Sequence, residues 1–458
     1  MNNGNMNNNN RNNTNRVRPV ASVSSVSSQK NLEPITHRSS VFDFRQFPVK
    51  YDIPFEDIVV AFYACVKNKR SSKDCLRFYP VYAQELVRLW EEVRRGVYQP
   101  RTSKCFVVRW PVYREVFAAN FADRVIHHWW AMRVNPLYEQ LFVKQGNVTM
   151  NCRKGFGSLK AIERVRQIVD EHPDWYVGRF DFEGYFMSMD KQLVSNSVKR
   201  LLRTQYQGQD LACLEYITDV IVLHCPQKDC IRRSDISLWD NIPKRKTLFG
   251  QPDGKGCAIG NLPSQLNANF LGAFLDYHIT VELGIKEYVR FVDDFVVFRP
   301  SGKEVAALVP DLEKYTSERM MLSLHPRKRL ILPVRQGFQF VGAYIHPGRT
   351  YISNRTRGKM MEKLHRFNCI AEEGKCERYL EKFVQSMNSY LGMMIHHNTY
   401  NIRHQVMMNM HKKWWKYIMF DGKLNRIIIR KAYKPTVIMK GKVKSGEYKR
   451  ILTPTLEI

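Results

Sequence analysis

The stretch Tyr288–Arg299 reads YVRFVDDFVVFR, and it constrains the fold of this chain more than any other. Two short runs rich in Val and Phe flank the acidic pair Asp293–Asp294. Such runs on either side of two polar residues predict a tight β-hairpin that carries the carboxylates at or beside its turn. Because Asp is a common turn residue, the pair alone fits ordinary turn chemistry as well as a functional site.

The segments around this hairpin predict a sheet backed by helices. Trp175–Phe180 is typical of a strand and ends directly before Asp181. A strand-like segment follows at Met321–Leu332, and a second hairpin is expected at Gln336–His346. This order of elements predicts an α+β fold with an antiparallel sheet. The intervening helices are predicted at Lys191–Leu202, at Leu211–His224, within Cys257–Ile279 after a turn, and at Lys303–Glu318.

The flanking regions differ in character. Residues 1 to about 40 are Asn-rich and then Ser/Val-rich, so we expect them to be disordered, either as a plain tail or as a weakly basic RNA tether. Helical spacing returns from Asn354 to about Tyr417, and a basic β-like tail is expected at Val437–Ile451. On the N-terminal side we predict helices at Pro54–Lys67 and Gln84–Arg95, a strand at Cys105–Val112, and a helix in the latter half of Arg114–Phe142 with Val125, Ile126, Trp129 and Met132 inward.

The charge balance points to a polyanionic partner. Lys and Arg number 72 against 43 Asp and Glu, a formal net charge of +29. Such an excess favours nucleic acid, whose binding should then depend strongly on salt. A ribosome-like or merely well-solvated basic surface is the alternative.

Other features limit the location of the chain. No run of 18 or more apolar residues is present, so no transmembrane helix is expected. The Asn-rich start has no apolar core of the kind found in signal peptides, which favours the cytoplasm. The ten cysteines are scattered without a zinc spacing, and we expect them to be reduced and structural.

Three carboxylates could form one site. If the strand that ends at Asp181 pairs beside the hairpin, its neighbour lies roughly 4.8 Å away. Asp181, Asp293 and Asp294 could then share two divalent ions about 3.5–4 Å apart, an arrangement suited to attack by a 3′ hydroxyl with release of pyrophosphate. Mg²⁺ is the expected ion, with Mn²⁺ as the alternative.

Several sequence blocks resemble the ordered motifs of reverse transcriptases. They are Asp181 with Phe186, IGNLPSQ at Ile259–Gln265, the FVDD hairpin, LHPRK at Leu324–Lys328 and GFQFVGAYI at Gly337–Ile345. Upstream, REVFAANFADRVIHH and NCRKGFGS resemble the finger motifs that precede them. The resemblance covers about Val107 to Ile345, with weaker support to Arg403, and its specificity is high because the blocks match in order.

The resemblance implies a right-hand polymerase with fingers, an antiparallel palm sheet and an all-helical thumb. The implied boundaries are a tail at 1–45, N-terminal helices and fingers at 46–173, a palm at 174–348 with an insertion at 191–256, a thumb at 349–430 and a basic tail at 431–458. IGNLPSQ and the thumb block SYLGMMIHHNTYNIR are similar to the diversity-generating retroelement branch. Members of that branch copy a template-repeat RNA into cDNA with errors at adenines. They act in bacterial cells, and some are encoded by phages. A small basic, oligomeric accessory protein works with them.

Residue roles follow from the matching positions. Asp181, Asp293 and Asp294 match the metal-binding aspartates, and the implied metal set also includes Phe182. Phe186 matches the residue that excludes a ribose 2′-OH, with core packing as its alternative, so deoxynucleotides (dNTPs) are the expected substrates. Lys328 matches a lysine that can protonate pyrophosphate, with a generic basic turn as its alternative.

The remaining implied contacts surround the incoming nucleotide. Ile259 stands where many relatives carry Gln, and an apolar residue there suits weak base discrimination. Gly260, Ser264 and Gln265 belong to the same block, and Ser264 and Gln265 are expected to shape one pocket. Arg109 and the pair Arg153–Lys154, in a Gly-bearing loop that opens a helix near Ser158, are candidates for triphosphate or template contacts, with solvated surface charge as the alternative.

Some features depart from the family pattern. Phe291 replaces the usual Tyr of the hairpin, and the region Cys225–Gly256 has no assigned counterpart. No endonuclease or RNase H signature follows the thumb, and no Val-Thr-Gly tripeptide of the retron type is found. The alternatives are a related reverse transcriptase of phage defence or group II intron type, and an RNA-binding scaffold without catalysis.

Overall fold

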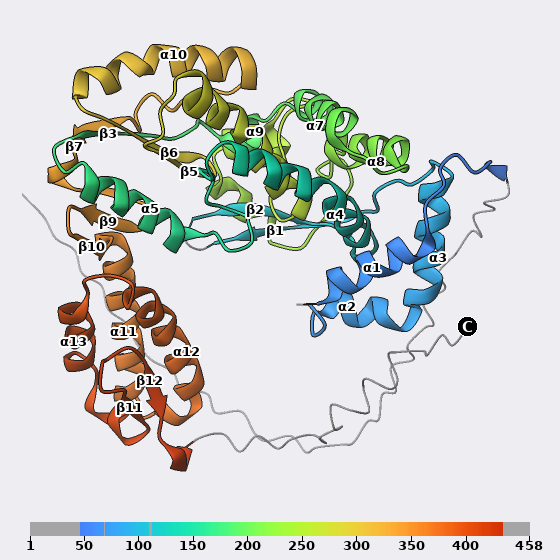
Figure 1. Ribbon diagram of the computed structural model, residues 1–458. Coiled ribbons are helices and arrows are strands. Elements are labelled where there is room, and N and C mark those ends of the chain that lie inside the picture. Colours follow the sequence, from blue (N-terminus) through green and yellow to red (C-terminus); the bar gives the residue numbers. More distant parts are fainter. Residues whose placement is uncertain (1–45, 68, 110–111, 434–458) are drawn as a thin grey trace, which may run out of the picture. The chain divides into compact units, whose positions relative to one another are not determined.

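The computed structural model describes residues 46–67, 69–109 and 112–433 (Figure 1). Every element below belongs to the unit that begins at Phe47. The tails expected at residues 1 to about 40 and at Val437–Ile451 lie outside the described residues. Within the described ranges, no helix combines the length and the apolar character needed to cross a membrane.

A four-stranded antiparallel sheet lies at the centre, in the order β5-β6-β3-β7. The predicted hairpin is confirmed as β5 and β6, and the predicted strand before Asp181 pairs with β6. The prediction of a strand at Met321–Leu332 is mostly wrong. The chain turns at His325–Lys328, and only the end of the segment joins the sheet. The strands are β3 (Tyr176–Phe180), β5 (Tyr288–Phe291), β6 (Asp294–Arg299) and β7 (Leu330–Pro333).

Strand alternation gives this sheet two buried faces. Phe180 and Phe295 belong to the core formed with α9 (Leu262–Tyr277) and α10 (Gly302–Met320). Val177 and Val296 point to the opposite face and join the core of α5 (Ser158–Glu171) and the second hairpin. Figure 1 accordingly shows α10 and α5 on opposite sides of the sheet. Burial of both faces explains the nearly continuous apolar runs in β5 and β6.

The second hairpin is confirmed but gains a third strand. Strands β8 (Phe338–Phe340), β9 (Ala343–His346) and β10 (Arg349–Ile352) pair antiparallel in sequence order. Another three-stranded sheet has the order β2-β1-β4, built from β1 (Ser103–Val108), β2 (Arg114–Ala118) and β4 (Cys230–Arg232). Its edge strand β4 comes from the unassigned region 225–256.

Helix α4 (Phe121–Lys144) is contacted by α1, α3, α7, α8 and α9, so it is buried on most sides. Val125, Ile126 and Trp129 lie inward as predicted, whereas Met132 is 44% exposed in the remaining solvent strip. The other helices of this half are α1 (Phe55–Val66), α2 (Lys73–Phe78), α3 (Tyr82–Arg94), α6 (Tyr185–Ser188), α7 (Lys191–Gln205) and α8 (Leu211–Leu223).

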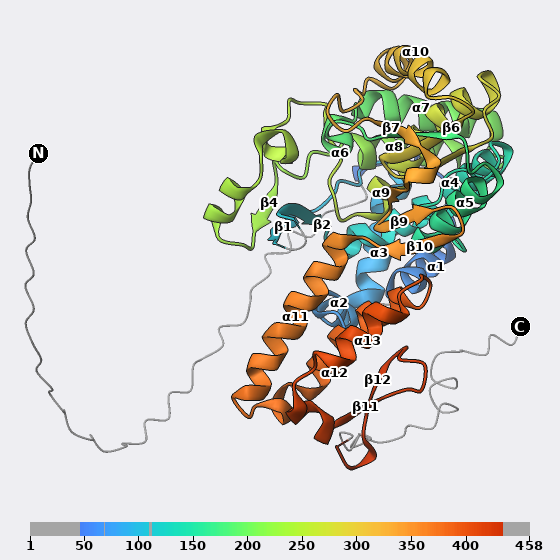
Figure 2. The same cartoon turned by 90° about the vertical axis from the view of Figure 1, so that its left-hand side faces the viewer.

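The C-terminal helices form a cluster with a separate apolar core (Figure 2). The cluster contains α11 (Asn354–Glu372), α12 (Cys376–Met394) and α13 (Tyr400–Met408). The all-helical expectation is wrong here, because β11 (Ile418–Phe420) and β12 (Ile427–Ile429) form an antiparallel hairpin after the helices. Three consecutive β-branched residues in β12 favour a strand over a helix.

Candidate functional site

The central hairpin has a two-residue turn, Val292–Asp293, because Phe291 pairs directly with Asp294. Val292 has a backbone φ of 59°, in the left-handed region. A β-branched residue rarely adopts this conformation, and glycine is usual at the first position of such a turn. The turn that carries Asp293 is therefore strained and needs support from its surroundings.

The third carboxylate lies opposite this turn. Phe180 pairs with Phe295 across β3 and β6, and their rings stack with centroids 5.2 Å apart. Continuing the same register by one residue sets Asp181 opposite Asp294. The end of β3 and the β5–β6 turn thus bring Asp181, Asp293 and Asp294 to one end of the sheet, as the sequence predicted.

Two cations accompany these acids. The ammonium Nζ of Lys328 contacts Asp181 Oδ2, and Arg179 Nη2 lies 3.3 Å from Asp294 Oδ1. Lys328 is delivered by the turn after α10, whose backbone is joined to β3 by a hydrogen bond from His325 N to Asp181 O at 2.7 Å. The structure therefore brings Lys328 to the carboxylates, while its expected role as a proton donor remains a prediction.

Two of the three acids have a raised pKa. Burial, and to a smaller extent the nearby charges of Asp181 and Asp294, raise the pKa of Asp293 to about 6 against the opposing effect of Arg114. Burial also raises the pKa of Asp294, with Arg179 as the main opposing charge. In both cases burial is the largest cause, and repulsion by the neighbouring acids adds to it.

The donor set suits hard divalent ions, which prefer carboxylate and carbonyl oxygens. Among the described residues, no three Asp, Glu, His or Cys side chains stand ready to ligate one ion together. Lys328 and Arg179 each contact one oxygen of the Asp181 and Asp294 carboxylates, which leaves the second oxygen of each group for a metal.

Phe182 can offer only its backbone carbonyl to a metal, because its side chain is buried hydrocarbon. The bridge between Phe182 and Leu324 uses Asp181 O and Glu183 N for its hydrogen bonds. The Phe182 carbonyl therefore takes no part in the hydrogen bonds of this bridge. The donor chemistry at Phe182 fits the expected metal set.

Phe186 and Ile259 lie together in a small apolar cluster that includes Phe117 of β2. Ile259 O accepts a hydrogen bond from Phe117 N at 2.8 Å. Gly260 has a φ of 119°, and a Cβ there would lie 2.6 Å from Phe117 O. Glycine is therefore required for this loop to approach β2 so closely.

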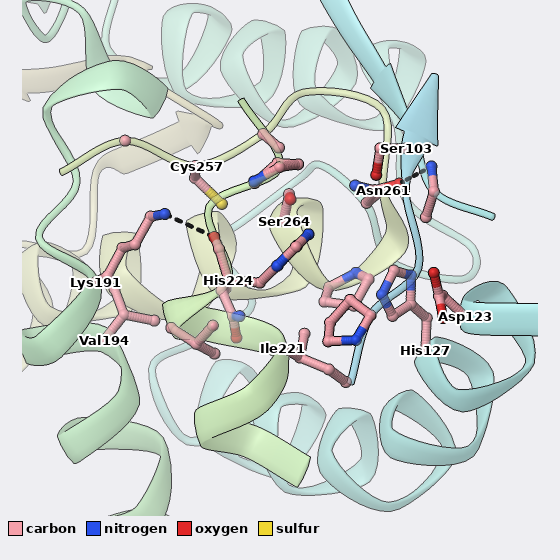
Figure 3. A pocket seen from close by; sticks show the side chains of 18 of the residues that line it. Ser103, Asp123, His127, Lys191, Val194, Ile221, His224, Cys257, Asn261 and Ser264 are labelled. Carbon is pink, nitrogen blue, oxygen red and sulfur yellow. Dashed lines mark hydrogen bonds between the residues drawn. The ribbon is translucent and has the colours of Figure 1, made fainter. Parts of the chain in front are cut away.

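Ser264 and Gln265, which are expected to shape the same nucleotide pocket, have different surroundings. Ser264 is buried and lines a pocket with Cys257, His127 and His224 (Figure 3). Gln265 is exposed and lies beside Cys152, with 4.0 Å between Oε1 and Sγ. Neighbouring residues on a helix point about 100° apart, so the start of α9 directs them to different sides.

The basic loop before α5 is arranged differently from the prediction. The Arg153 side chain is only 1% exposed, and its Nη2 lies 2.9 Å from Glu139 Oε2. It also donates to Thr149 O at 2.9 Å and lies over the Phe156 ring. Its guanidinium holds the loop together and is not directed to a nucleotide, because protein partners already occupy it. Lys154 is exposed and remains a candidate for phosphate contact.

Arg109 is exposed near the tip of β1 and lies close to Asp235 of region 225–256. The pKa of Asp235 is lowered by its hydrogen bonds to Ser237 and, to a smaller extent, by Arg109. Arg114, which pairs with Val108 across the same hairpin, is the cation that acts on Asp293. The sequence did not single out Arg114, because only the tertiary fold sets which arginine of this hairpin lies near the acids; the role of Arg109 in nucleotide or template contact stays a prediction.

Two further residues were missed. Arg179 precedes Asp181 by two positions in a strand, a spacing that places both on one face and could have identified it. Glu115 is 1% exposed and accepts hydrogen bonds from Trp239 Nε1 at 2.9 Å, Thr247 Oγ1 at 2.7 Å and Leu248 N at 2.5 Å. It anchors region 225–256 to β2, and no local pattern signals this contact.

No family model matches the chain, and no curated protein matches its sequence. Among solved structures, it is similar to apo telomerase from Candida tropicalis truncated from its C-terminal domain, with 13% identity, a TM-score of 0.37 and 53% of each chain covered. It is also similar to telomerase from Candida albicans in complex with a TWJ fragment of telomeric RNA, with 12% identity, a TM-score of 0.38, and 70% of this chain and 59% of that chain covered. The chain thus spans between half and two thirds of the length of these telomerases. These scores are too low to support a function, so the proposal below rests on the geometry of the site.

Proposed function

We propose that this protein is an RNA-directed DNA polymerase whose nucleotidyl-transfer site is formed by Asp181, Asp293 and Asp294. The observation that carries the proposal is the convergence of these three carboxylates at one end of an antiparallel sheet. The raised pKa of Asp293 supports it, because perturbed carboxyl groups that are buried beside other acids are common at functional sites. In this proposal the central sheet is the palm, and the sheet β2-β1-β4 belongs to the fingers.

Mg²⁺, or Mn²⁺, held by the three carboxylates and the Phe182 carbonyl would activate the 3′ hydroxyl and neutralise charge on the departing pyrophosphate. Asp293 must be ionised to take part, so synthesis should fall as the pH drops through about 6. Lys328, already on Asp181, is close enough to the acids to give a proton to pyrophosphate. Arg114, whose charge acts on Asp293, would bind the triphosphate.

We further propose membership of the diversity-generating branch. On this proposal the template is a template-repeat RNA, and a small basic accessory protein assists its binding. Ile259 and Phe186 both pack against the same apolar cluster, and the Ile259 side chain offers no polar contact to an incoming base. This apolar contact would weaken base discrimination and allow errors opposite adenine.

Primer extension on an RNA template with dNTPs and Mg²⁺ tests the main proposal. The full chain should synthesise cDNA, and Asp293→Ala and Asp294→Ala should each reduce the rate by at least ~10³-fold while RNA binding is kept. Asp253→Ala is the matched control, since that aspartate is exposed and its carboxylate pairs with Lys228 and not with a residue of the site. The proposal would be overturned if either site variant were as active as the unmodified chain. It would also be overturned if the unmodified chain bound RNA without making cDNA.

Sequencing of the cDNA tests the finer assignment. Misincorporation concentrated at template adenines would support the diversity-generating branch. Uniform fidelity at all four bases would instead favour a related reverse transcriptase of the phage-defence or group II intron type. Thermal unfolding measures metal binding independently of activity. Mg²⁺ should raise the Tm of the unmodified chain but not that of the Asp293→Ala variant.

A further inference from the structure

A fully buried ion pair lies directly beneath the strained turn. Arg290 of β5 and Asp276 of α9 both have side chains that are 0% exposed. The guanidinium donates Nε to Asp276 Oδ1 at 2.7 Å and Nη2 to Oδ2 at 2.6 Å. A buried pair of this kind costs desolvation energy that a well-packed apolar pair would not, so its presence calls for an explanation beyond stability.

The two terminal nitrogens of the Arg290 guanidinium also contact three other segments. Nη1 donates to the backbone carbonyl of Val292 at 3.0 Å, which ties the guanidinium to the turn. Nη2 also donates to Thr149 Oγ1 at 2.7 Å and to Asn269 O at 3.2 Å. The carboxylate of Asp276 accepts a further hydrogen bond from Tyr288 at 2.8 Å.

Helix α9 makes room for this arrangement at Gly272. A Cβ at this position would collide with the guanidinium of Arg290. The guanidinium therefore occupies space that any other residue at 272 would fill. Its planar fork can bind the carboxylate with one edge while it holds the turn carbonyl with another donor.

We propose that Arg290, held by Asp276, is the positioning residue that fixes the Val292–Asp293 turn and thereby places the Asp293 carboxylate beside Asp181 and Asp294. The turn needs this support because Val292 has a φ of 59°. Without the bond to its carbonyl, Val292 would relax toward a negative φ and carry Asp293 away from the other two acids. This inference rests on the proposed function for its catalytic consequence, but its effect on metal binding is independent of catalysis.

Arg290→Lys in the full chain tests the proposal, because lysine keeps the charge but cannot bind Asp276 and Val292 O together. We expect kcat for primer extension to fall at least about tenfold while KM for dNTP changes less than about threefold. Binding of Mn²⁺ alone, measured by electron paramagnetic resonance, should weaken about tenfold. Arg403→Lys is the matched control, since Arg403 is also buried and hydrogen-bonded but belongs to α13.

Rescue distinguishes positioning from stability. Glycine accepts a φ of 59° without strain, so Val292→Gly added to Arg290→Lys should restore kcat and Mn²⁺ affinity at least threefold, without restoring Tm. If Arg290→Lys does not fold, the isosteric Thr149→Val, which removes the hydroxyl that accepts from Arg290 and donates to Asp276, should show a smaller loss with the same rescue.

The outcomes separate the two proposals. An unmodified chain that makes no cDNA refutes the proposed function, and Mn²⁺ binding then still tests the positioning role. Unchanged Mn²⁺ affinity and unchanged kcat in Arg290→Lys refute the positioning role alone. A loss that Val292→Gly does not reverse also refutes it, because the ion pair would then serve only stability.

Discussion

At the scale of the residue, Asp293 meets two opposing requirements. Its function in the proposed reaction needs an ionised carboxylate, whereas burial and two neighbouring acids favour the protonated form. The fold tolerates this conflict because the turn is tied to the buried pair below it. Strain and repulsion thus coincide at one turn, as is common for sites that bind a compensating ligand.

Asp293→Asn should therefore stabilise the metal-free fold while it abolishes synthesis. The folded state holds the Asp293 proton more tightly than the unfolded state, so stability contributed by this group falls as pH rises from 3.8 toward about 6. In EDTA, the variant should unfold roughly 1–3 °C above the unmodified chain at pH 8, with a smaller difference at pH 5. Thermal unfolding at both pH values measures the difference in Tm between the variant and the unmodified chain. The same difference at pH 5 and pH 8 would show that ionisation of Asp293 does not destabilise the metal-free fold.

Phe186 allows a second prediction at this scale. It is half-buried and packs edge-on against Tyr185, with ring centroids 5.8 Å apart. If it excludes the 2′ hydroxyl, Phe186→Ala should raise the use of ribonucleotides relative to dNTPs by about tenfold or more, since a steric barrier is removed. Competitive incorporation assays test this. A variant that loses activity with both nucleotides equally would instead indicate core packing.

At the scale of the element, region 225–256 becomes part of the β2-β1-β4 sheet. Its strand β4 pairs parallel with β1, and its short turns are held by Glu115 of β2. Arg245 of the same region lies 2.8 Å from Glu183, two residues after Asp181. The region therefore links the β2-β1-β4 sheet to the end of β3 beside the three acids.

Glu115→Gln should loosen this region without unfolding the rest. The glutamine amide would place its own N–H donors against the donors of Trp239, Thr247 and Leu248, at a cost of about 1–3 kcal/mol. Limited trypsin digestion should then cut faster within Lys244–Lys246, whose three side chains are exposed. Glu163→Gln, at an exposed glutamate paired with Lys160, serves as the control and should leave the cleavage pattern unchanged.

At the scale of the whole molecule, the net charge of +29 dominates. Each phosphate neutralised by the chain should contribute roughly 0.7–0.9 to the slope of log affinity against log salt. Affinity for primed RNA should therefore fall at least about tenfold between about 50 and about 200 mM salt. Fluorescence anisotropy with the full chain measures this, and the slope should be unchanged in Asp294→Ala. A salt-independent affinity would contradict phosphate binding as the main source of affinity.

The sequence by itself determined the local structure and the identity of the acids. The hairpin, the strand before Asp181, and most helices follow from apolar period and turn chemistry, which are encoded within a few residues. The three carboxylates could be chosen because strand ends and turns have recognisable patterns. These signals are short in range, so they fixed which residues form each element and which of them carry charge.

Only the tertiary structure decided which side chains meet. Arg153 turned out to be buried against Glu139, and Ser264 and Gln265 point to different sides of α9. Arg114 acts on Asp293, and Glu115 accepts bonds from residues more than a hundred positions away. Such contacts depend on how separate elements pack and on which donors remain to be satisfied when they do. No local pattern records that choice, which is why the acids were predictable and their partners were not.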